Sequence, residues 1–202
     1  MKHVEELIRR YPCLAAVRGQ IEAAVETIEQ MHKSGGTLLL AGNGGSAADC
    51  EHISGELLKG FLKKRPYPEN SLPGLAPEEA RVLQQGIRAL PLPSLTALST
   101  AFSNDCAPEA VLGQTVGVFA RPGDVFFGIS TSGNAKNVCF AARVARAKGL
   151  PVIALTGAGG GKLASFADIT IRVPETETFK IQELHLPVYH AICAQAEEDL
   201  FA

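Results

Sequence analysis

The stretch Thr37-Leu38-Leu39-Leu40-Ala41-Gly42-Asn43-Gly44-Gly45-Ser46 decides the fold of this chain. An apolar run that breaks into glycines and then enters a helical segment predicts a buried strand, a tight turn and a helix. Glycines let backbone N–H groups approach an anion, and a helix N-terminus adds partial positive charge. The stretch therefore predicts an anion site.

A second small-polar turn repeats this arrangement. Residues 124–129 read as another buried strand, and Ser130-Thr131-Ser132-Gly133-Asn134 follows before a further helical run. Two such turns in one domain predict a single ligand held by hydroxyls and backbone amides. A sugar phosphate fits this description best.

Composition limits the class of protein. A chain of 202 residues suits one domain, 1–202, and its net charge of -2 argues against binding to nucleic acid or to an anionic membrane. No 18-residue apolar run and no signal-peptide core occur. The five cysteines lack CxxC spacing, which is typical of reduced thiols. We expect a cytoplasmic protein.

Short apolar runs alternate with helical patterns along most of the chain. This predicts a three-layer α/β/α sandwich around a mostly parallel five-stranded sheet, with the ligand beyond the carboxyl ends of the strands. An amphipathic pattern over 13–33 predicts a long N-terminal helix. The expected strands are 37–41, 92–98, 125–129, 152–155 and 169–173, and the expected helices are 2–11, 13–33, 46–62, 108–120, 134–148, 161–166 and 180–201.

Residues 63–93 interrupt this alternation. Six of the 12 prolines lie there, after Lys63-Lys64-Arg65. We interpret the segment as a surface insertion that could contain a short helix over 76–90.

Two groups of side chains could carry chemistry. His52 and Glu56 are four apart on one helix face, which suits a metal site, an acid/base pair or plain surface decoration. The last helix carries Gln182 and His190, and His190 alone could equally be a satisfied core residue. A kink at Pro187 could turn both toward a common point.

Two rival motifs are weaker. Residues 42–47 fit the dinucleotide pattern G-x-G-x-x-A, but no acidic residue ends a second strand as that site requires. Residues 157–162 resemble a P-loop with one residue too few, and Leu163 stands where Ser or Thr is needed. A tight turn before a short helix is the preferred reading of 157–162.

The ordered motifs resemble the phosphoheptose isomerases, which are sedoheptulose-7-phosphate isomerases of the SIS (sugar isomerase) fold. The resemblance covers most of 13–201 outside 63–93. It rests on Ala41-Gly-Asn-Gly-Gly-Ser46, His52 and Glu56, Ser103-Asn104-Asp105, Gly128-Ile-Ser-Thr-Ser-Gly-Asn134, Gln182-Glu183 and His190, in that order.

The resemblance implies an aldose–ketose isomerase that interconverts sedoheptulose 7-phosphate and D-glycero-D-manno-heptose 7-phosphate through an enediol. It implies a homotetramer with active sites between subunits, and zinc held by His52, Glu56, Gln182 and His190. Glu56 and His190 would be the acid/base pair. Residues that match substrate contacts are Asn43, Gly44, Gly45, Ser46, Asn104, Asp105, Ser130, Thr131, Ser132 and Gln182.

The chain departs from the family pattern at the ligand end. This chain has Ala135 where the family has a serine, and Gly60 where it has a basic residue. It has Phe179 in place of an acidic residue and Cys106 in place of an aromatic one. Two alternatives therefore stay open. One is a non-catalytic SIS protein that senses sugar phosphates or associates with the replication initiator DnaA, and the other is an isomerase of another sugar phosphate. The absence of a helix-turn-helix ahead of the sugar site argues against a transcriptional regulator.

Overall fold

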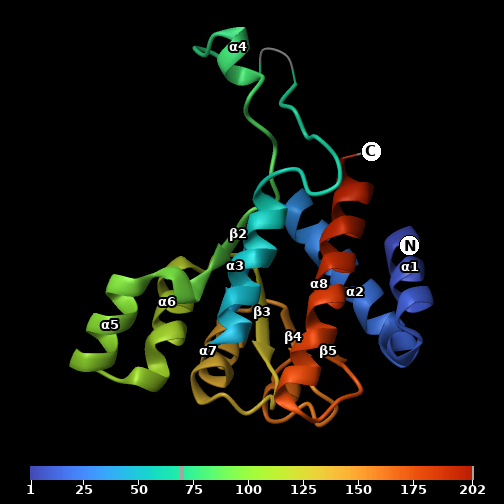
Figure 1. The fold of residues 1–202 in the computed structure, drawn as a ribbon. Helices are drawn as coiled ribbons and strands as arrows, with labels where there is room; N and C mark the ends of the chain where they lie inside the picture. The colour runs from blue at the N-terminus through green and yellow to red at the C-terminus, as the bar shows by residue number, and fades with distance from the viewer. Residues whose placement is uncertain (69–70, 202) are drawn as a thin grey trace.

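A computed structural model describes residues 1–68 and 71–201 of the protein. Its centre is a five-stranded sheet in which every neighbouring pair is parallel (Figure 1). The strand order is β2-β1-β3-β4-β5. The strands are β1 (Leu38–Ala41), β2 (Ala89–Pro91), β3 (Val125–Ser130), β4 (Val152–Thr156) and β5 (Ile169–Arg172). The predicted α/β fold with a parallel five-stranded sheet is confirmed.

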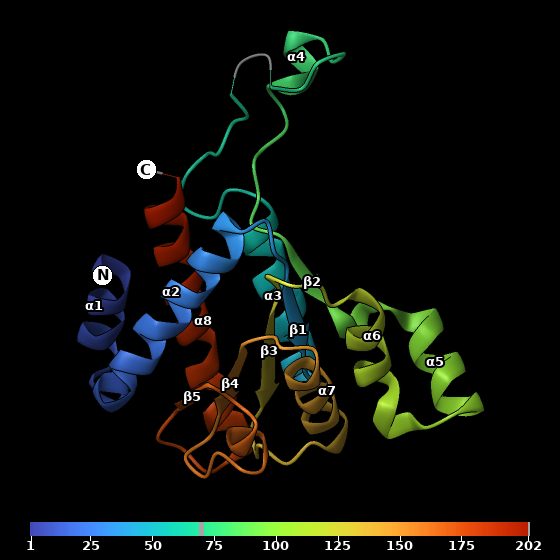
Figure 2. The same ribbon diagram turned by 180° about the vertical axis from the view of Figure 1, so that it is seen from behind.

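Helices cover both faces of this sheet (Figure 2). The helices are α1 (Lys2–Arg10), α2 (Arg18–Lys33), α3 (Gly45–Leu58), α4 (Pro77–Ala80), α5 (Thr96–Asp105), α6 (Val111–Phe119), α7 (Lys136–Ala147) and α8 (Thr178–Leu200). Short 3-10 turns span Pro12–Val17, Leu92–Ser94, Pro108–Ala110 and Leu163–Ser165. One face packs against α1, α2, α3 and α8, and the other against α6 and α7.

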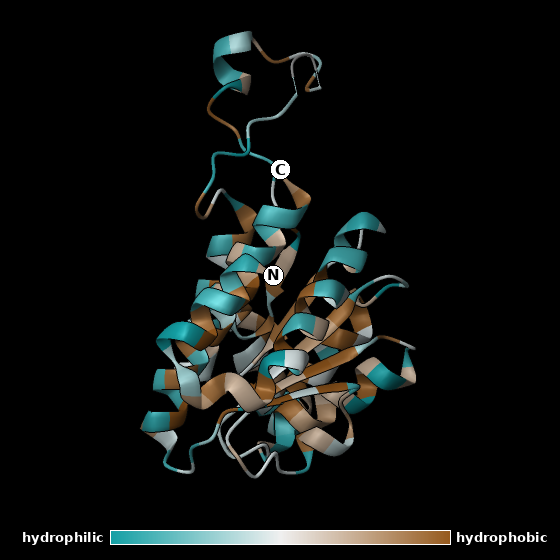
Figure 3. Ribbon diagram, turned by 90° about the vertical axis from the view of Figure 1, so that its right-hand side faces the viewer, coloured by the Kyte–Doolittle hydropathy of each residue, from teal (hydrophilic) through white to brown (hydrophobic). Residues whose placement is uncertain are grey.

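The pleat of the strands divides the buried side chains between two cores. Leu38 and Leu40 of β1 enter the core beneath α2, α3 and α8, whereas Leu39 and Ala41 enter the core beneath α6 and α7. This alternation explains why β1 is an unbroken apolar run, since a strand covered on both faces has no polar side. Figure 3 shows the apolar strands between helices whose outer surfaces are hydrophilic.

Three expectations for single elements are wrong. Residues 92–98 form a 3-10 turn and the start of α5, and the strand lies earlier, at β2. The proposed helix over 76–90 is reduced to α4, which has no buried residue to stabilise a longer helix. The first residues of the helix expected at 13–33 form a 3-10 turn after Pro12.

The segment interpreted as an insertion leaves the body of the protein and returns to it. Residues 66–68 and 71–84 form an arm that rises beyond the end of α3 and carries α4 (Figure 1). The bridge between Pro66 and Gln84 closes its base. Below that bridge, the buried Arg65 donates from Nε to Glu197 Oε1 of α8 at 2.8 Å. The final residues of the proposed insertion, 89–91, are β2 at the sheet edge.

Candidate active site

Helices α3 and α8 run side by side in the same direction, and their register positions the candidate residues. Near the start of both helices, a Cβ added at Gly45 would lie 2.5 Å from Gln182 Nε2. One to two turns later His52 faces His190, and beyond the end of α3 the backbone of Phe61 reaches Glu197. In these contacts the residue on α8 follows its partner in the sequence by 136–138 positions, so the two helices keep the same register along their length.

Three of the predicted residues meet midway along these helices. His52 Nε2 lies 3.3 Å from Glu56 Oε1 and 3.4 Å from His190 Nε2. The rings of the two histidines stack edge to face with centroids 4.9 Å apart. Glu56 and His190 are half-buried, whereas His52 is exposed. A carboxylate and two imidazoles are thus close enough to exchange protons, and a ligand can still reach them.

The environment sets the charge of Glu56 and His190. Burial raises the pKa of the Glu56 carboxyl, but the bond to Lys59 Nζ at 2.9 Å and the nearby His52 outweigh it, so the pKa lies below its usual value. Burial and then the neighbouring His52 lower the pKa of His190. At neutral pH the pair therefore consists of an ionised carboxylate and a neutral imidazole, which are the forms that accept protons.

The first glycine turn lies where the chain leaves β1 and enters α3. Gly44 takes a positive φ of 54° that side chains rarely adopt, and this opens the turn ahead of the first helical N–H groups. Asn43 and Gly45 are exposed there, while Ser46 is buried and donates its N–H to the Asn43 carbonyl at 3.0 Å. The predicted strand, glycine turn and helix are present, and anion binding there stays a prediction.

The second turn follows β3 and is tied to two neighbouring loops. Gly133 takes a φ of 65°, and an added Cβ would lie 2.0 Å from the Gly160 carbonyl oxygen, so only glycine fits. Ser132 Oγ accepts the Asn134 N–H at 3.1 Å, and the Thr131 carbonyl accepts the Gly157 N–H at 3.0 Å.

A pair of amides joins the first turn to α7, the helix that follows the second turn. Asn43 Nδ2 donates to Asn137 Oδ1 and Asn137 Nδ2 donates to Asn43 Oδ1, both at 2.8 Å. The two turns therefore lie at the same edge of the sheet, as the carboxyl ends of parallel strands require. The segment at 157–161 closes onto the second turn before a 3-10 helix, which agrees with its reading as a tight turn.

Within one protomer the four proposed zinc ligands do not come together. Gln182 lies at the glycine turn, and eight helical residues separate it from His190, about 12 Å along the axis. The hypothesis that Pro187 turns Gln182 toward His190 is therefore wrong for a single chain. Over residues 1–68 and 71–201, no three or more His, Cys, Asp or Glu form a group that could hold a metal ion.

Asn104 and Asp105 lie at the end of α5, on the outer side of α6 and away from α3 and α8 (Figures 1 and 2). Asn104 Nδ2 donates to Asp105 Oδ1 at 2.8 Å. The protomer does not bring these two residues to the cluster of Glu56, His52 and His190.

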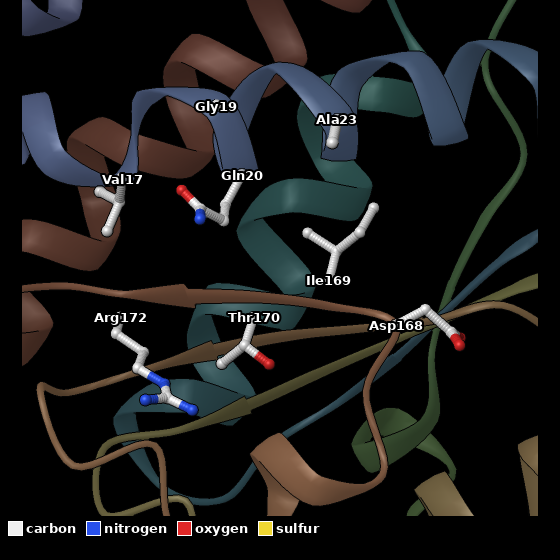
Figure 4. A pocket seen from close by; sticks show the side chains of 8 residues that line it. All are labelled: Val17, Gly19, Gln20, Ala23, Asp168, Ile169, Thr170 and Arg172. Atoms are coloured by element: carbon white, nitrogen blue, oxygen red, sulfur yellow. The ribbon is translucent and has the colours of Figure 1, made fainter.

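Two further cavities lie away from the two turns. A cavity of about 280 Å³ extends from His190 between α1 and α8, and Arg10, Tyr11 and Glu183 contribute to its walls. Another of about 550 Å³ separates α2 from the edge strand β5 (Figure 4). Gln20, Arg172 and their neighbours line the second cavity, which contains none of the predicted site residues. The first cavity gives His190 a second open side.

Sequence reasoning missed the polar residues that support this cluster. The Tyr189 hydroxyl contacts both His52 and Asp49, and Asn137 holds Asn43. The available signals were weak: Asp49 is three residues before His52 on one helix, and Tyr189 directly precedes His190. In the described part of the chain, no helix is long and apolar enough to cross a membrane.

A doubly covered parallel sheet with two glycine-serine turns at its carboxyl edge defines an α/β sandwich protein, and residues 4–157 match the SIS domain family. The phosphoheptose isomerase of Rhodospirillum rubrum is 39% identical over 189 residues, which are 94% of this chain and 87% of that protein. That of Aneurinibacillus thermoaerophilus is 39% identical over 180 residues, 89% of this chain and 81% of the relative. The chain belongs to the phosphoheptose isomerase family.

Solved structures agree with this placement. The phosphoheptose isomerase of Neisseria gonorrhoeae superimposes with a TM-score of 0.78 and 32% identity, covering 98% of this chain and 96% of that one. The enzyme of Francisella tularensis gives 0.79 and 26% identity, covering 96% and 94%. The long N-terminal helix and the order of layers are therefore those of this family.

Proposed function

We propose that the protein is an aldose–ketose isomerase that interconverts sedoheptulose 7-phosphate and D-glycero-D-manno-heptose 7-phosphate. The observation that carries the proposal is the meeting of Glu56, His52 and His190 within 3.3–3.4 Å contacts, on the two helices that also flank the glycine turn. Binding alone needs neither a carboxylate nor a pair of imidazoles at this place. This geometry therefore favours catalysis over a sensor or an adaptor.

The reaction moves a carbonyl between neighbouring carbons. Glu56, kept ionised by Lys59, removes the proton from the carbon next to the carbonyl, and an enediol forms as the carbonyl oxygen gains a proton from the ring N–H of His190. His190, neutral at rest, then takes a proton from the hydroxyl on the neighbouring carbon and so returns to its neutral form. Return of the proton from Glu56 to the other carbon completes the exchange, so no atom is gained or lost.

The phosphate would bind at the paired turns. Backbone N–H groups after Gly44 and the hydroxyls of Ser130, Thr131 and Ser132 are the donors available there. Position 135 offers no hydroxyl because it is alanine, and it begins α7 without a side-chain cap. Gln182 stands over the first turn, where it can hydrogen-bond a sugar hydroxyl.

Assembly, zinc and location belong to this proposal as well. We expect a homotetramer, because Asn104, Asp105 and Gln182 lie apart from the Glu56 cluster in one chain and a neighbouring subunit could supply the missing contacts. Metal analysis of the purified tetramer tests whether zinc is bound by His52, Glu56, Gln182 and His190. A cytoplasmic location accords with the five free cysteines, since reducing compartments keep thiols unpaired.

Turnover of sedoheptulose 7-phosphate by the purified protein tests the proposal directly. Glu56→Gln and His190→Gln should each reduce kcat about 10²–10⁴-fold, the usual contribution of an acid/base group, without changing the oligomer. Glu51→Gln is the matched control, because Glu51 is an exposed carboxylate on the same helix that bonds Ser94 instead. Near-normal activity in the Glu56 or His190 variant would refute the assignment. Turnover of a different ketose phosphate alone would refute the substrate and keep the reaction class.

A further inference from the structure

The glycine-rich segment 157–161 packs its backbone directly against the second turn. A Cβ added at Gly161 would lie 2.4 Å from the Ser132 carbonyl oxygen, so the two stretches of main chain meet without any side chain between them. The chain can approach the turn this closely only through glycine. Lys162, the residue that follows the last glycine, therefore begins beside the hydroxyls of the second turn.

The main chain of Lys162 is fixed to that turn by hydrogen bonds. Its N–H donates to Asn134 Oδ1 at 3.1 Å, and the Asn134 N–H donates to Ser132 Oγ at 3.1 Å. The next residue, Leu163, donates its N–H to the Gly133 carbonyl at 2.8 Å. The lysine side chain thus starts one residue away, through hydrogen bonds, from a hydroxyl that the proposed function gives to the phosphate.

The ammonium group of Lys162 is not engaged elsewhere. The side chain is exposed, and in the described part of the chain its Nζ forms neither an ion pair nor a hydrogen bond. By contrast, Lys136 at the start of α7 is paired with Glu109 at 2.7 Å. Arg172 packs behind Gly160 and lines the cavity between α2 and β5. Lys162 is therefore the cation that remains available at the second turn.

A thiol beneath the turn reports where this charge lies. Cys139 Sγ is 3.6 Å from the Gly133 carbonyl oxygen, which places it directly under the second turn. Burial raises the pKa of the Cys139 thiol, and the positive charge of Lys162 partly opposes that rise. The ammonium of Lys162 is therefore close enough to the turn for its charge to be felt there.

The donors already assigned to the phosphate leave its charge unbalanced. A phosphate monoester carries a charge of about −1.5 to −2 at pH 7, whereas hydroxyls and backbone amides are neutral. Position 135 adds no further donor side chain, because it is alanine. A lysine ammonium on a flexible four-carbon stem is a common point charge for phosphate in proteins.

We propose that Lys162 binds the substrate phosphate at the second turn and supplies the positive charge that the hydroxyls and amides there lack. The inference rests on the proposed function for the identity of the sugar. Binding of phosphate itself can be measured whether or not the protein is an isomerase.

Thermal unfolding with inorganic phosphate as the probe tests this binding. Phosphate should raise the Tm of the wild type above its value in sodium chloride at the same ionic strength, because a ligand that binds the folded protein stabilises it. Lys162→Met removes the charge but keeps the N–H that Asn134 accepts, so its Tm in chloride should match that of the wild type. Its dissociation constant for phosphate should be about ten- to a hundredfold higher, the usual contribution of a hydrogen bond to a charged group.

Two further variants show whether the charge itself is responsible. Lys162→Arg keeps a cation at this position and should retain most of the phosphate affinity. Lys136→Met is the matched control, because it removes a lysine close to the same turn that is held by Glu109. Its phosphate affinity should equal that of the wild type.

Kinetics with sedoheptulose 7-phosphate provide a second readout. We expect KM to rise about ten- to a hundredfold in Lys162→Met with kcat nearly unchanged, because the phosphate is bound alike before and during the reaction. The KM of the wild type should also increase more steeply with salt than that of the variant, since salt screens the lost attraction.

The outcomes separate this inference from the isomerase assignment. Equal phosphate binding in the wild type and Lys162→Met, or no specific stabilisation of the wild type by phosphate, would overturn the inference and leave the assignment intact. A lower kcat in Lys162→Met with unchanged KM would overturn it as well. Loss of phosphate binding in Lys162→Met, in a protein that does not turn over sedoheptulose 7-phosphate, would support the inference and refute the proposed substrate.

Discussion

Substitution of Glu197 by glutamine should destabilise the protein strongly, because this carboxylate anchors the base of the arm. Its side chain is 1% exposed, and it accepts the backbone N–H groups of Phe61, Leu62 and Lys63 at 2.6–3.0 Å. It also accepts Nε of Arg65, whose side chain is fully buried. Glutamine keeps the shape but removes the charge and turns an amide hydrogen toward these donors.

The size of the effect follows from this burial. Breaking a buried ion pair on one side typically costs about 3–5 kcal/mol, because the other charge is left uncompensated. For a domain of this length, each kcal/mol lowers Tm by about 2–4 °C, so Tm should fall by about 6–20 °C. Arg65→Met in the Glu197→Gln background should recover part of the loss, since it removes the orphaned charge.

Calorimetry at a fixed protein concentration measures this difference. Glu198→Gln is the matched control: it is the next residue on α8, pairs with Lys63 at 2.9 Å and is 32% exposed. Exposed pairs of this kind contribute little, so its Tm should stay close to that of the wild type. Equal Tm values for the two variants would refute the reasoning that the Glu197 pair anchors the arm.

Three further predictions concern single residues. Burial lowers the pKa of His185 to about 4, below the usual 6.5, so the unfolded chain binds the extra proton first as pH falls. Between pH 7 and pH 5 this residue should remove about 2 kcal/mol of unfolding free energy, and urea titrations of His185→Leu should lack that part of the decline. Gly45→Ala should displace the Gln182 amide, lowering activity with little change in Tm. Gly44→Ala should instead lower stability by at least about 1 kcal/mol, because its φ is 54°.

The sequence predicts the body of the fold well because both faces of the sheet are covered. Three strands, β1, β3 and β4, are mainly apolar runs such as Leu38–Ala41, and a glycine-containing turn follows each. The fifth strand, β2, has three residues, ends in Pro91 and pairs only with β1. Proline is tolerated at a sheet edge, so such a strand carries almost no sequence signal. Helix α5 has no buried residue and therefore no apolar face to recognise.

The site is less accessible to sequence reasoning, and the reason is geometric. The spacing of His52 and Glu56 places them on one helix face, and the structure agrees. Their meeting with His190 depends on the register of two helices that are 138 residues apart, which no local pattern contains. The resemblance to a family supplied that pairing. It did not supply Tyr189 or Asp49, which contact each other beside His52.

Helix α8 places three residues of the protein's separate regions on one continuous helix. Gln182 lies at the glycine turn, His190 lies beside His52, and Glu197 bonds the base of the arm. Each residue added to or removed from a helix rotates everything beyond it by about 100°. Deletion of one residue between positions 182 and 190 would thus keep Gln182, His190 and Glu197 in the sequence. It would still rotate the side chains at one end of the helix away from their contacts. Variation among relatives in this interval should consequently take the form of exchanges and never of gaps.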